Sequence, residues 1–180
     1  MTVMKMSKSL LIVVCLVGLA FAQTIDNCPT SVPRDQYTVV FGNQCFQFVL
    51  YRTRDYPDAL KDCQSRDGTL ALTKTKAVEQ FLQTQAVTYG LQEALWIGLN
   101  DKATENTFVW EDGTALDEAE SNWSDDEGPR TGIIQHNLED CVATNTGKNG
   151  QWEDYHCDNE FFGLINYEKH YICSFDLIPK

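Results

Sequence analysis

The sequence has 180 residues, with 26 acidic and 14 basic side chains and a formal net charge of −12. Nucleic acid is excluded as an expected partner, because phosphate backbones bind positively charged surfaces. Hydrophobic residues make up 43% of the chain and aromatic residues 11%. This content excludes an intrinsically disordered chain and is sufficient for the core of one globular domain.

The first 22 residues have the pattern of a secretory signal peptide. Lys5 and Lys8 precede an apolar run over 10–22, which ends in small residues at Ala20 and Ala22. The run is too short to cross a bilayer, and no other long apolar run follows it. We therefore expect a secreted, extracellular protein with no membrane span.

The cysteines indicate disulfide bonds. One of the seven, Cys15, lies in the leader, and an even number remains, as is typical of a disulfide-bonded secreted chain. Spacing alone does not choose among the possible pairings. No Cys-x-x-Cys pair occurs, which disfavours structural zinc. The six are Cys28, Cys45, Cys63, Cys141, Cys157 and Cys173.

Several stretches have the composition of β-strands. β-branched and aromatic residues over 37–41 and 45–51 flank Gly42-Asn43, which predicts a hairpin. Short apolar or alternating runs predict further strands at 95–99, 107–110, 141–143, 151–152 and 171–175. The tryptophans at 96, 110 and 152 lie in these runs and are therefore expected in the core.

Two helices are predicted between the hairpin and the strand at 95–99. Pro57 suits the first turn of one helix, and Gly68 suits its stop. Thr75 can cap a second helix that ends before Gly90. The predicted buried stripe of this second helix consists of Val78, Phe81, Leu82 and Ala86.

Residues 112–140 predict a long acidic loop. They are rich in Asp, Glu, Gly and Pro and show almost no apolar periodicity. Loops of this length in a compact domain are usually functional or disordered. Trp123 favours an ordered loop, because a large aromatic residue in its middle suggests an anchor on the core.

Carboxylates cluster around two of the cysteines. Glu139 precedes Cys141, and Glu153 and Asp154 precede Cys157. If these cysteines pair, the resulting hairpin can bring the three carboxylates to one end. Hard carboxylate oxygens on a rigid scaffold are what Ca²⁺ requires. The alternative, that each acid near a turn simply faces water, stays open.

A fixed order of short motifs runs through the chain: Cys28-Pro29, Cys45-Phe46, Cys63 in a helix, Trp96-Ile97-Gly98-Leu99, Phe108-Val109-Trp110-Glu111-Asp112-Gly113, Asn122-Trp123, Glu139-Asp140-Cys141, Trp152-Glu153-Asp154 and Tyr171-Ile172-Cys173. This order resembles the C-type lectin domain family. The resemblance implies an α+β double-loop fold with two helices, two small antiparallel sheets, a long ligand-binding loop and three disulfides.

The resemblance also implies domain boundaries and cysteine pairs. The leader pattern predicts a signal peptide over 1–22, and the resemblance implies a lectin-like domain over 28–175, with a short N-terminal extension at 23–27 and a C-terminal tail at 176–180. The implied disulfides are Cys28–Cys45, Cys63–Cys173 and Cys141–Cys157.

In sugar-binding members of the family, a Glu-Pro-Asn or Gln-Pro-Asp triplet follows the Asn-Trp pair and binds Ca²⁺ and sugar. Here Glu127 matches the first position, whereas Arg130 cannot bind a cation and is a candidate hydrogen-bond donor to a sugar. The family's Trp-Asn-Asp triplet keeps Asp154 but carries Glu153 in place of the asparagine. The resemblance thus implies Ca²⁺ ligands at Glu127, Glu139, Glu153 and Asp154, and a sugar site formed by these residues and Arg130.

Two functions follow from this resemblance. The first is a secreted lectin that recognises glycans or glycoproteins, with Ca²⁺ bound in a modified site. The second is a Ca²⁺-independent lectin-like module for protein, matrix or mineral surfaces, which the altered triplets favour. An enzyme is not expected, because adjacent acids on a strand, such as Glu153 and Asp154, point to opposite faces.

Overall fold

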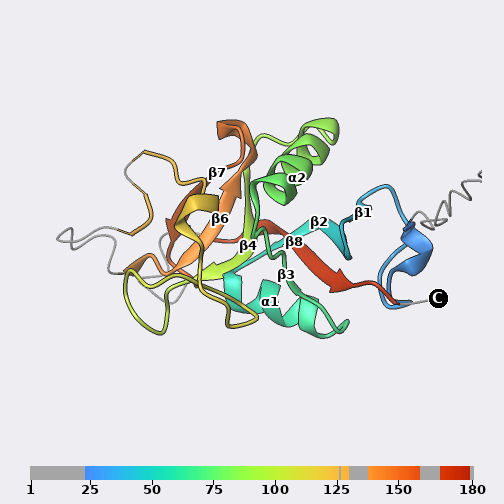
Figure 1. The fold of residues 1–180 in the computed structure, drawn as a ribbon, viewed down its shortest axis with the longest axis horizontal. Coiled ribbons are helices and arrows are strands. Elements are labelled where there is room, and N and C mark those ends of the chain that lie inside the picture. The colour runs from blue at the N-terminus through green and yellow to red at the C-terminus, as the bar shows by residue number, and fades with distance from the viewer. Residues whose placement is uncertain (1–22, 126, 130–137, 159–166, 179–180) are drawn as a thin grey trace, which may run out of the picture.

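The structure is a computed structural model that describes residues 23–125, 127–129, 138–158 and 167–178 (Figure 1). The predicted signal peptide and Arg130 lie outside these residues. The strands are β1 (Thr38–Phe41), β2 (Gln44–Arg54), β3 (Thr69–Leu70), β4 (Ala94–Asn100), β5 (Val109–Trp110), β6 (Cys141–Asn145), β7 (Gln151–Tyr155) and β8 (Lys169–Asp176). The helices are α1 (Tyr56–Gln64) and α2 (Lys76–Thr88), with 3-10 turns η1 (Ile25–Asn27), η2 (Glu118–Glu120) and η4 (Thr146–Lys148).

The strands form one sheet in the order β1-β2-β8-β4-β6-β7, with β3 beside β8 and β5 beside β4. The two predicted antiparallel sheets are its two halves, β1-β2-β8 and β4-β6-β7. A short parallel pairing of β4 with β8 joins the halves, with Leu95 opposite His170 and Trp96 opposite Tyr171. The predicted α+β fold with two helices is therefore confirmed.

Both helices begin at polar caps. The side chain of Asp55 accepts a hydrogen bond from the backbone N–H of Asp58 at the start of α1. The predicted cap Thr75 accepts from the N–H of Val78 at the start of α2. Such caps satisfy N–H groups that have no partner inside the helix. Among the described residues, no helix has the length and apolar character needed to cross a membrane.

The inner face of α2 contains a buried residue that was not part of the predicted buried stripe. Leu82 and Ala86 are buried as expected, but Glu79 is also buried, with 4% of its surface exposed. Its Oε1 accepts a hydrogen bond from the hydroxyl of Thr144 on β6 at 2.8 Å. Burial raises the pKa of Glu79, while Thr144, Trp152 and nearby Thr73 act in the opposite direction. The contact ties α2 to the half of the sheet that contains β6 and β7.

The core has two parts, and tryptophans occupy both. Trp96 lies in one part, among residues of α1, β2 and β8. Trp110 and Trp152 lie in the other, between α2 and the β4-β6-β7 half. All three are at most 2% exposed, so the prediction that they are core residues is confirmed.

The three disulfides join the pairs that the family resemblance implied. Cys28 is bonded to Cys45, Cys63 to Cys173 and Cys141 to Cys157. The bond from α1 to β8 joins cysteines 110 positions apart, and in the chain-entropy account it restricts the unfolded chain by about 4.7 kcal/mol.

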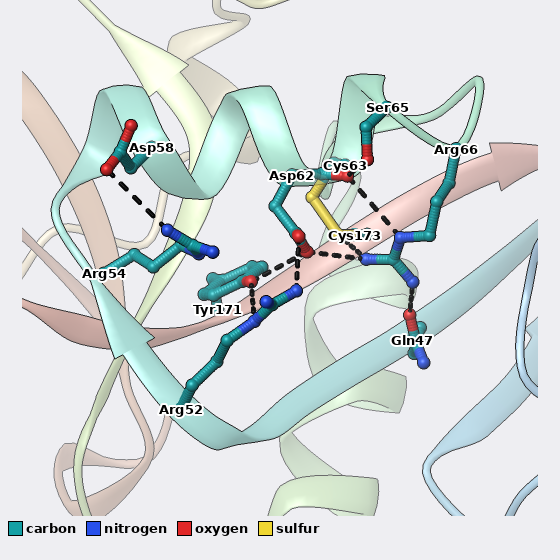
Figure 2. Close-up of polar contacts among 10 residues, drawn as sticks. All are labelled: Gln47, Arg52, Arg54, Asp58, Asp62, Cys63, Ser65, Arg66, Tyr171 and Cys173. Atoms are coloured by element: carbon teal, nitrogen blue, oxygen red, sulfur yellow. Dashed lines mark hydrogen bonds and ion pairs between the residues drawn. A yellow bond between two sulfur atoms is a disulfide. The ribbon is translucent and has the colours of Figure 1, made fainter.

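A polar network holds α1 against β2 and β8. Figure 2 shows the carboxylate of Asp62 on α1 among donors from β8, β2 and the turn after α1: Tyr171 Oη at 2.8 Å, Arg52 Nη2, and Arg66 Nη2 at 3.0 Å. Arg66 also donates to Gln47. Burial alone would raise the pKa of Asp62, but Tyr171, Arg66 and Arg52 outweigh it and lower the pKa. The charged carboxylate therefore stabilises the fold.

We predict that Asp62→Asn lowers the free energy of unfolding at pH 7 by about 2 kcal/mol, because two partly buried guanidinium groups lose their counter-charge. The folded pKa of Asp62 is lowered, so its contribution is complete above the unfolded value near 3.8 and is lost as pH falls through the folded value. Urea unfolding at pH 7 and at pH 2 measures both effects.

The matched control is Asp58→Asn. Asp58 also pairs with an arginine, Arg54, but at 3.7 Å and with 58% of its side chain exposed. This change should alter stability by less than about 0.5 kcal/mol. An equal loss in both variants would contradict the central role of Asp62.

Candidate functional site

The candidate site is built on the antiparallel hairpin β6–β7. Val142 pairs with Asp154 and Ala143 with Glu153, so the two predicted acids lie at adjacent positions of β7. The Cys141–Cys157 disulfide links the two ends of the hairpin that lie away from its turn. The predicted hairpin, closed by a disulfide bond, is therefore present.

The acidic loop is attached to β7 at Trp123. Backbone hydrogen bonds run from Ser124 N to Trp152 O at 2.9 Å and from Trp152 N to Asn122 O at 2.8 Å. The Trp123 ring packs perpendicular to the Trp152 ring with centroids 5.6 Å apart, and it also contacts Phe108 at 4.7 Å. Trp123 is thus the anchor that the sequence suggested, and it positions the residues that follow it.

Glu127 lies against Asp154 because of this attachment. The N–H of Gly128 donates to Asp154 Oδ1 at 3.2 Å, and Glu127 is hydrogen-bonded to the same carboxylate. Burial, the contact with Asp154 and the charges of Glu153 and Glu139 all raise the pKa of Glu127. Like charges in contact disfavour the ionised form, which accounts for the raised pKa of Glu127.

Glu153 has a different environment from its neighbour. It is 5% exposed, and its carboxylate accepts hydrogen bonds from Lys148 Nζ, Tyr155 Oη and, at 2.9 Å, Asn145 Nδ2. Burial would raise the pKa of Glu153, but these three donors lower it. Glu153 is therefore a charged and internally paired carboxylate.

The structure brings four of the five predicted site residues into one electrostatic neighbourhood. Glu139 is half-buried, and its charge, like those of Asp154 and Glu153, raises the pKa of Glu127. Arg130 lies outside the described residues. Within the described ranges, no three acidic, histidine or cysteine side chains form a group ready to hold a metal ion.

A buried acid that the sequence analysis passed over lies beside this group. Asp101, which follows β4, is 3% exposed; its Oδ2 accepts from Asn106 N at 2.7 Å, while its Oδ1 has no hydrogen-bond partner among the described residues. Burial and the charges of Glu105, Asp140 and Asp154 raise the pKa of Asp101 to about 7, against the hydrogen bond from Asn106. The spacing of Asp101 and Glu105, two acids at either end of a tight turn after a buried strand, was the available signal.

Asp140 connects the two sets of acids. Its carbonyl oxygen accepts from the N–H of Asp101 at 3.1 Å, and it directly precedes Cys141 at the start of β6. Burial raises the pKa of Asp140, while His156 and Lys102 lower it. Both sets of acids therefore lie where the loop after β4, the long acidic loop and β7 meet.

A family model described as Lectin C-type domain matches residues 52–175. The chain belongs to the C-type lectin domain family. Collectin-10 of Gallus gallus is 34% identical over 124 residues, covering 69% of this chain and 42% of collectin-10. Tetranectin of Homo sapiens is 31% identical over 144 residues, covering 75% of this chain and 61% of tetranectin. The chain thus spans less than two thirds of the length of these relatives.

Solved structures share the fold. The human scavenger receptor C-type lectin carbohydrate-recognition domain superposes with a TM-score of 0.63 at 27% identity, covering 81% of this chain and 98% of that domain. The C-type carbohydrate-recognition domain of cow CD23 gives a TM-score of 0.64 at 24% identity, covering 82% and 98%. At that identity, the second comparison supports the fold alone.

We predict that Gly128→Ala detaches the loop from Asp154. Gly128 has φ +82°, and an added Cβ would lie 2.4 Å from the Trp123 ring, so the backbone or the ring must move. The free energy of unfolding should fall by roughly 3 kcal/mol, from the unfavourable φ and from the steric contact. Urea unfolding measures the loss.

Gly113→Ala separates these two causes. Gly113 has a similar φ of +81°, but nothing lies within 4 Å of the position of its added Cβ. This control should lose only about 1 kcal/mol, from the backbone conformation. Equal losses in both variants would mean that the packing of Gly128 on Trp123 does not matter.

Proposed function

We propose that this C-type lectin domain binds glycans at the end of the β6–β7 hairpin, with Ca²⁺ held by the acids that meet there. The observation that carries the proposal is the contact between Glu127 and Asp154, two carboxylates contributed by the acidic loop and by β7. Bringing two like charges together lowers stability unless a proton or a cation accompanies them. A cation site accounts for this arrangement.

The chemistry of the oxygen donors in these acids supports a proposal of Ca²⁺. The cation prefers carboxylate and carbonyl oxygens and tolerates irregular geometry. Asp101 Oδ1 is a buried oxygen with no hydrogen-bond partner, and a buried acceptor without a partner normally destabilises a protein. Glu127, Glu139 and Asp154 would hold the ion beside the hairpin, with Asp101, Glu105 and Asp140 as a second oxygen-rich group next to them.

The chain's own residues would select the ligand. A bound Ca²⁺ would supply coordination positions for two neighbouring sugar hydroxyls, and the carboxylates of Glu127 and Asp154 would accept the hydroxyl protons. The amide donors of the family's sugar-binding triplets are missing, because Glu153 replaces one and Arg130 the other. We therefore propose that Arg130 donates to the sugar oxygens.

Family membership supports a binding module rather than an enzyme. The similar solved structures include the human scavenger receptor C-type lectin carbohydrate-recognition domain, at 27% identity. The leader pattern in 1–22 supports secretion to the extracellular space, where glycans and millimolar Ca²⁺ occur together.

A second candidate is a lectin-like module that binds protein, matrix or mineral surfaces without Ca²⁺. The pairing of Glu153 with Lys148 favours this function, because it gives one of the predicted ligands a cation from within the chain. The two candidates differ in whether ligand binding requires Ca²⁺.

We predict that the protein binds Ca²⁺ with a dissociation constant on the order of 10⁻⁴ to 10⁻³ M, the range of extracellular modules. Ca²⁺ should raise the melting temperature in a concentration-dependent manner, because it binds the folded loop and hardly the unfolded chain. Asp154→Asn should abolish the shift, since it removes a charge but keeps the acceptor for Gly128. Calorimetry and thermal unfolding measure both effects.

Asp176→Asn is the control for this prediction, because it removes the same charge from an exposed position at the end of β8. It should leave the Ca²⁺ response unchanged. Absence of any Ca²⁺ binding at millimolar concentration would reject the cation site.

We predict that a glycan array probed in millimolar Ca²⁺ shows binding that EDTA removes and that excess Ca²⁺ restores, because the ion forms part of the ligand contact. Asp154→Asn should lose this binding together with its Ca²⁺ response. Glycan binding that persists in EDTA would instead support the Ca²⁺-independent candidate.

A further inference from the structure

The turn between β6 and β7 places a lysine on the carboxylate of Glu153. Lys148 ends the 3-10 turn η4, and the next two residues, Asn149 and Gly150, have φ of +58° and +75°. These left-handed residues reverse the chain directly after Lys148. The Lys148 ammonium then lies against Glu153 Oε1, five residues further along the chain.

The other Glu153 oxygen is occupied by neutral donors. Oε2 accepts from the hydroxyl of Tyr155 and from Asn145 Nδ2, the latter at 2.9 Å. The Asn145 side chain also accepts from the N–H of Gly147 at 3.1 Å, so the same residue caps η4 and orients Glu153. Both carboxylate oxygens therefore have partners within the hairpin.

Exposure differs sharply between the two charged partners. Glu153 is 5% exposed, whereas 56% of the Lys148 side chain is exposed. The lysine can therefore move into solvent, but the glutamate cannot leave without unfolding the hairpin. Because a buried carboxylate that loses its charged partner is destabilised, removal of the Lys148 charge should destabilise the folded state unless another cation takes its place.

We propose that Lys148 is a built-in counter-ion that occupies Glu153 and competes with Ca²⁺ for it, and so sets the Ca²⁺ affinity of the site. The proposal rests on the proposed function, because it concerns the same cation site. Lys148 also lies within electrostatic reach of Glu127. Its charge thus opposes an incoming cation at both acids. With Lys148 in place, Ca²⁺ is held without the Glu153 carboxylate.

The test compares Ca²⁺ titration calorimetry and thermal unfolding of the native protein with those of Lys148→Met. The variant keeps the length of the aliphatic side chain but removes the charge. Without Ca²⁺ it should melt at a lower temperature than the native protein. Its Ca²⁺ dissociation constant should be roughly tenfold lower, because the ion gains a carboxylate ligand.

Lys74→Met is the matched control, because it removes one positive charge, as Lys148→Met does, and breaks a lysine–aspartate pair, with Asp112, outside the hairpin. Its Ca²⁺ affinity should equal that of the native protein. The double variant Lys148→Met/Glu153→Gln should lose the gain in affinity, since the glutamine has no charge for the ion.

Different outcomes separate this proposal from the proposed function. Tighter Ca²⁺ binding by Lys148→Met than by the native protein, with the gain lost in the double variant, would support it. Equal affinities of the native protein and Lys148→Met would overturn it and leave the Ca²⁺ site standing, as would a gain that persists in the double variant. No Ca²⁺ binding by either protein would overturn both. If Lys148→Met is unfolded without Ca²⁺, refolding on Ca²⁺ addition supports the proposal, and failure to refold overturns it.

Discussion

The short parallel pairing of β4 with β8 is the contact on which the rest of the domain depends. It joins two antiparallel half-sheets that would otherwise have separate edges. Trp96 lies at this junction, fully buried, and its indole N–H donates to Arg54 O on β2 at 3.0 Å. One ring thus fixes β2, β4 and β8 relative to one another. Because β6 pairs with β4 and β7 pairs with β6, the position of the candidate site depends on this junction.

Four buried or half-buried carboxylates, Asp62, Glu153, Asp101 and Glu127, have three kinds of environment. Asp62 is surrounded by two arginines and a tyrosine, so its charge is favourable. Glu153 accepts hydrogen bonds from donors of its own hairpin. Asp101 and Glu127 have mainly other acids as charged neighbours, and their pKa values are raised by burial and by those charges. The hydrogen-bonded charges of Asp62 and Glu153 stabilise the fold. Asp101 and Glu127 repel their acidic neighbours when ionised, and a bound cation would reduce this repulsion.

Local patterns in the sequence were sufficient for most of the framework. The Thr75 cap, the hairpin around Gly42 and the strand over 95–99 depend on neighbouring residues, and all are present. The disulfide pairs were not derivable from spacing and came only from the order of motifs. The long loop was recognised by its composition, and Trp123 was recognised as its anchor, but the contact partner Trp152 could not be deduced from composition.

The features that the sequence analysis did not identify depend on contacts between distant segments or on unusual backbone conformations. The pairing of Lys148 with Glu153 requires a left-handed Asn149, which no apolar period reveals. In the sequence, Asp101 is only the residue at the end of a predicted strand. Its burial beside Asp140 is evident only in the folded structure. Glu79 interrupts an apolar stripe and is buried because Thr144 on β6 supplies a donor. In each case the contact partner cannot be identified from a short stretch of the sequence.

The packing of Trp123 gives the domain an intrinsic optical reporter. Trp96, Trp110 and Trp152 are sealed in the core, whereas Trp123 is only partly buried and lies four residues before Glu127. Emission from the three core rings reports on the fold as a whole, while Trp123 responds to the polarity at the end of the hairpin. Its edge-to-face contact with Trp152 also allows excitation energy to pass between the two rings. Ligand binding at the proposed site would therefore be expected to change the fluorescence of the unlabelled protein.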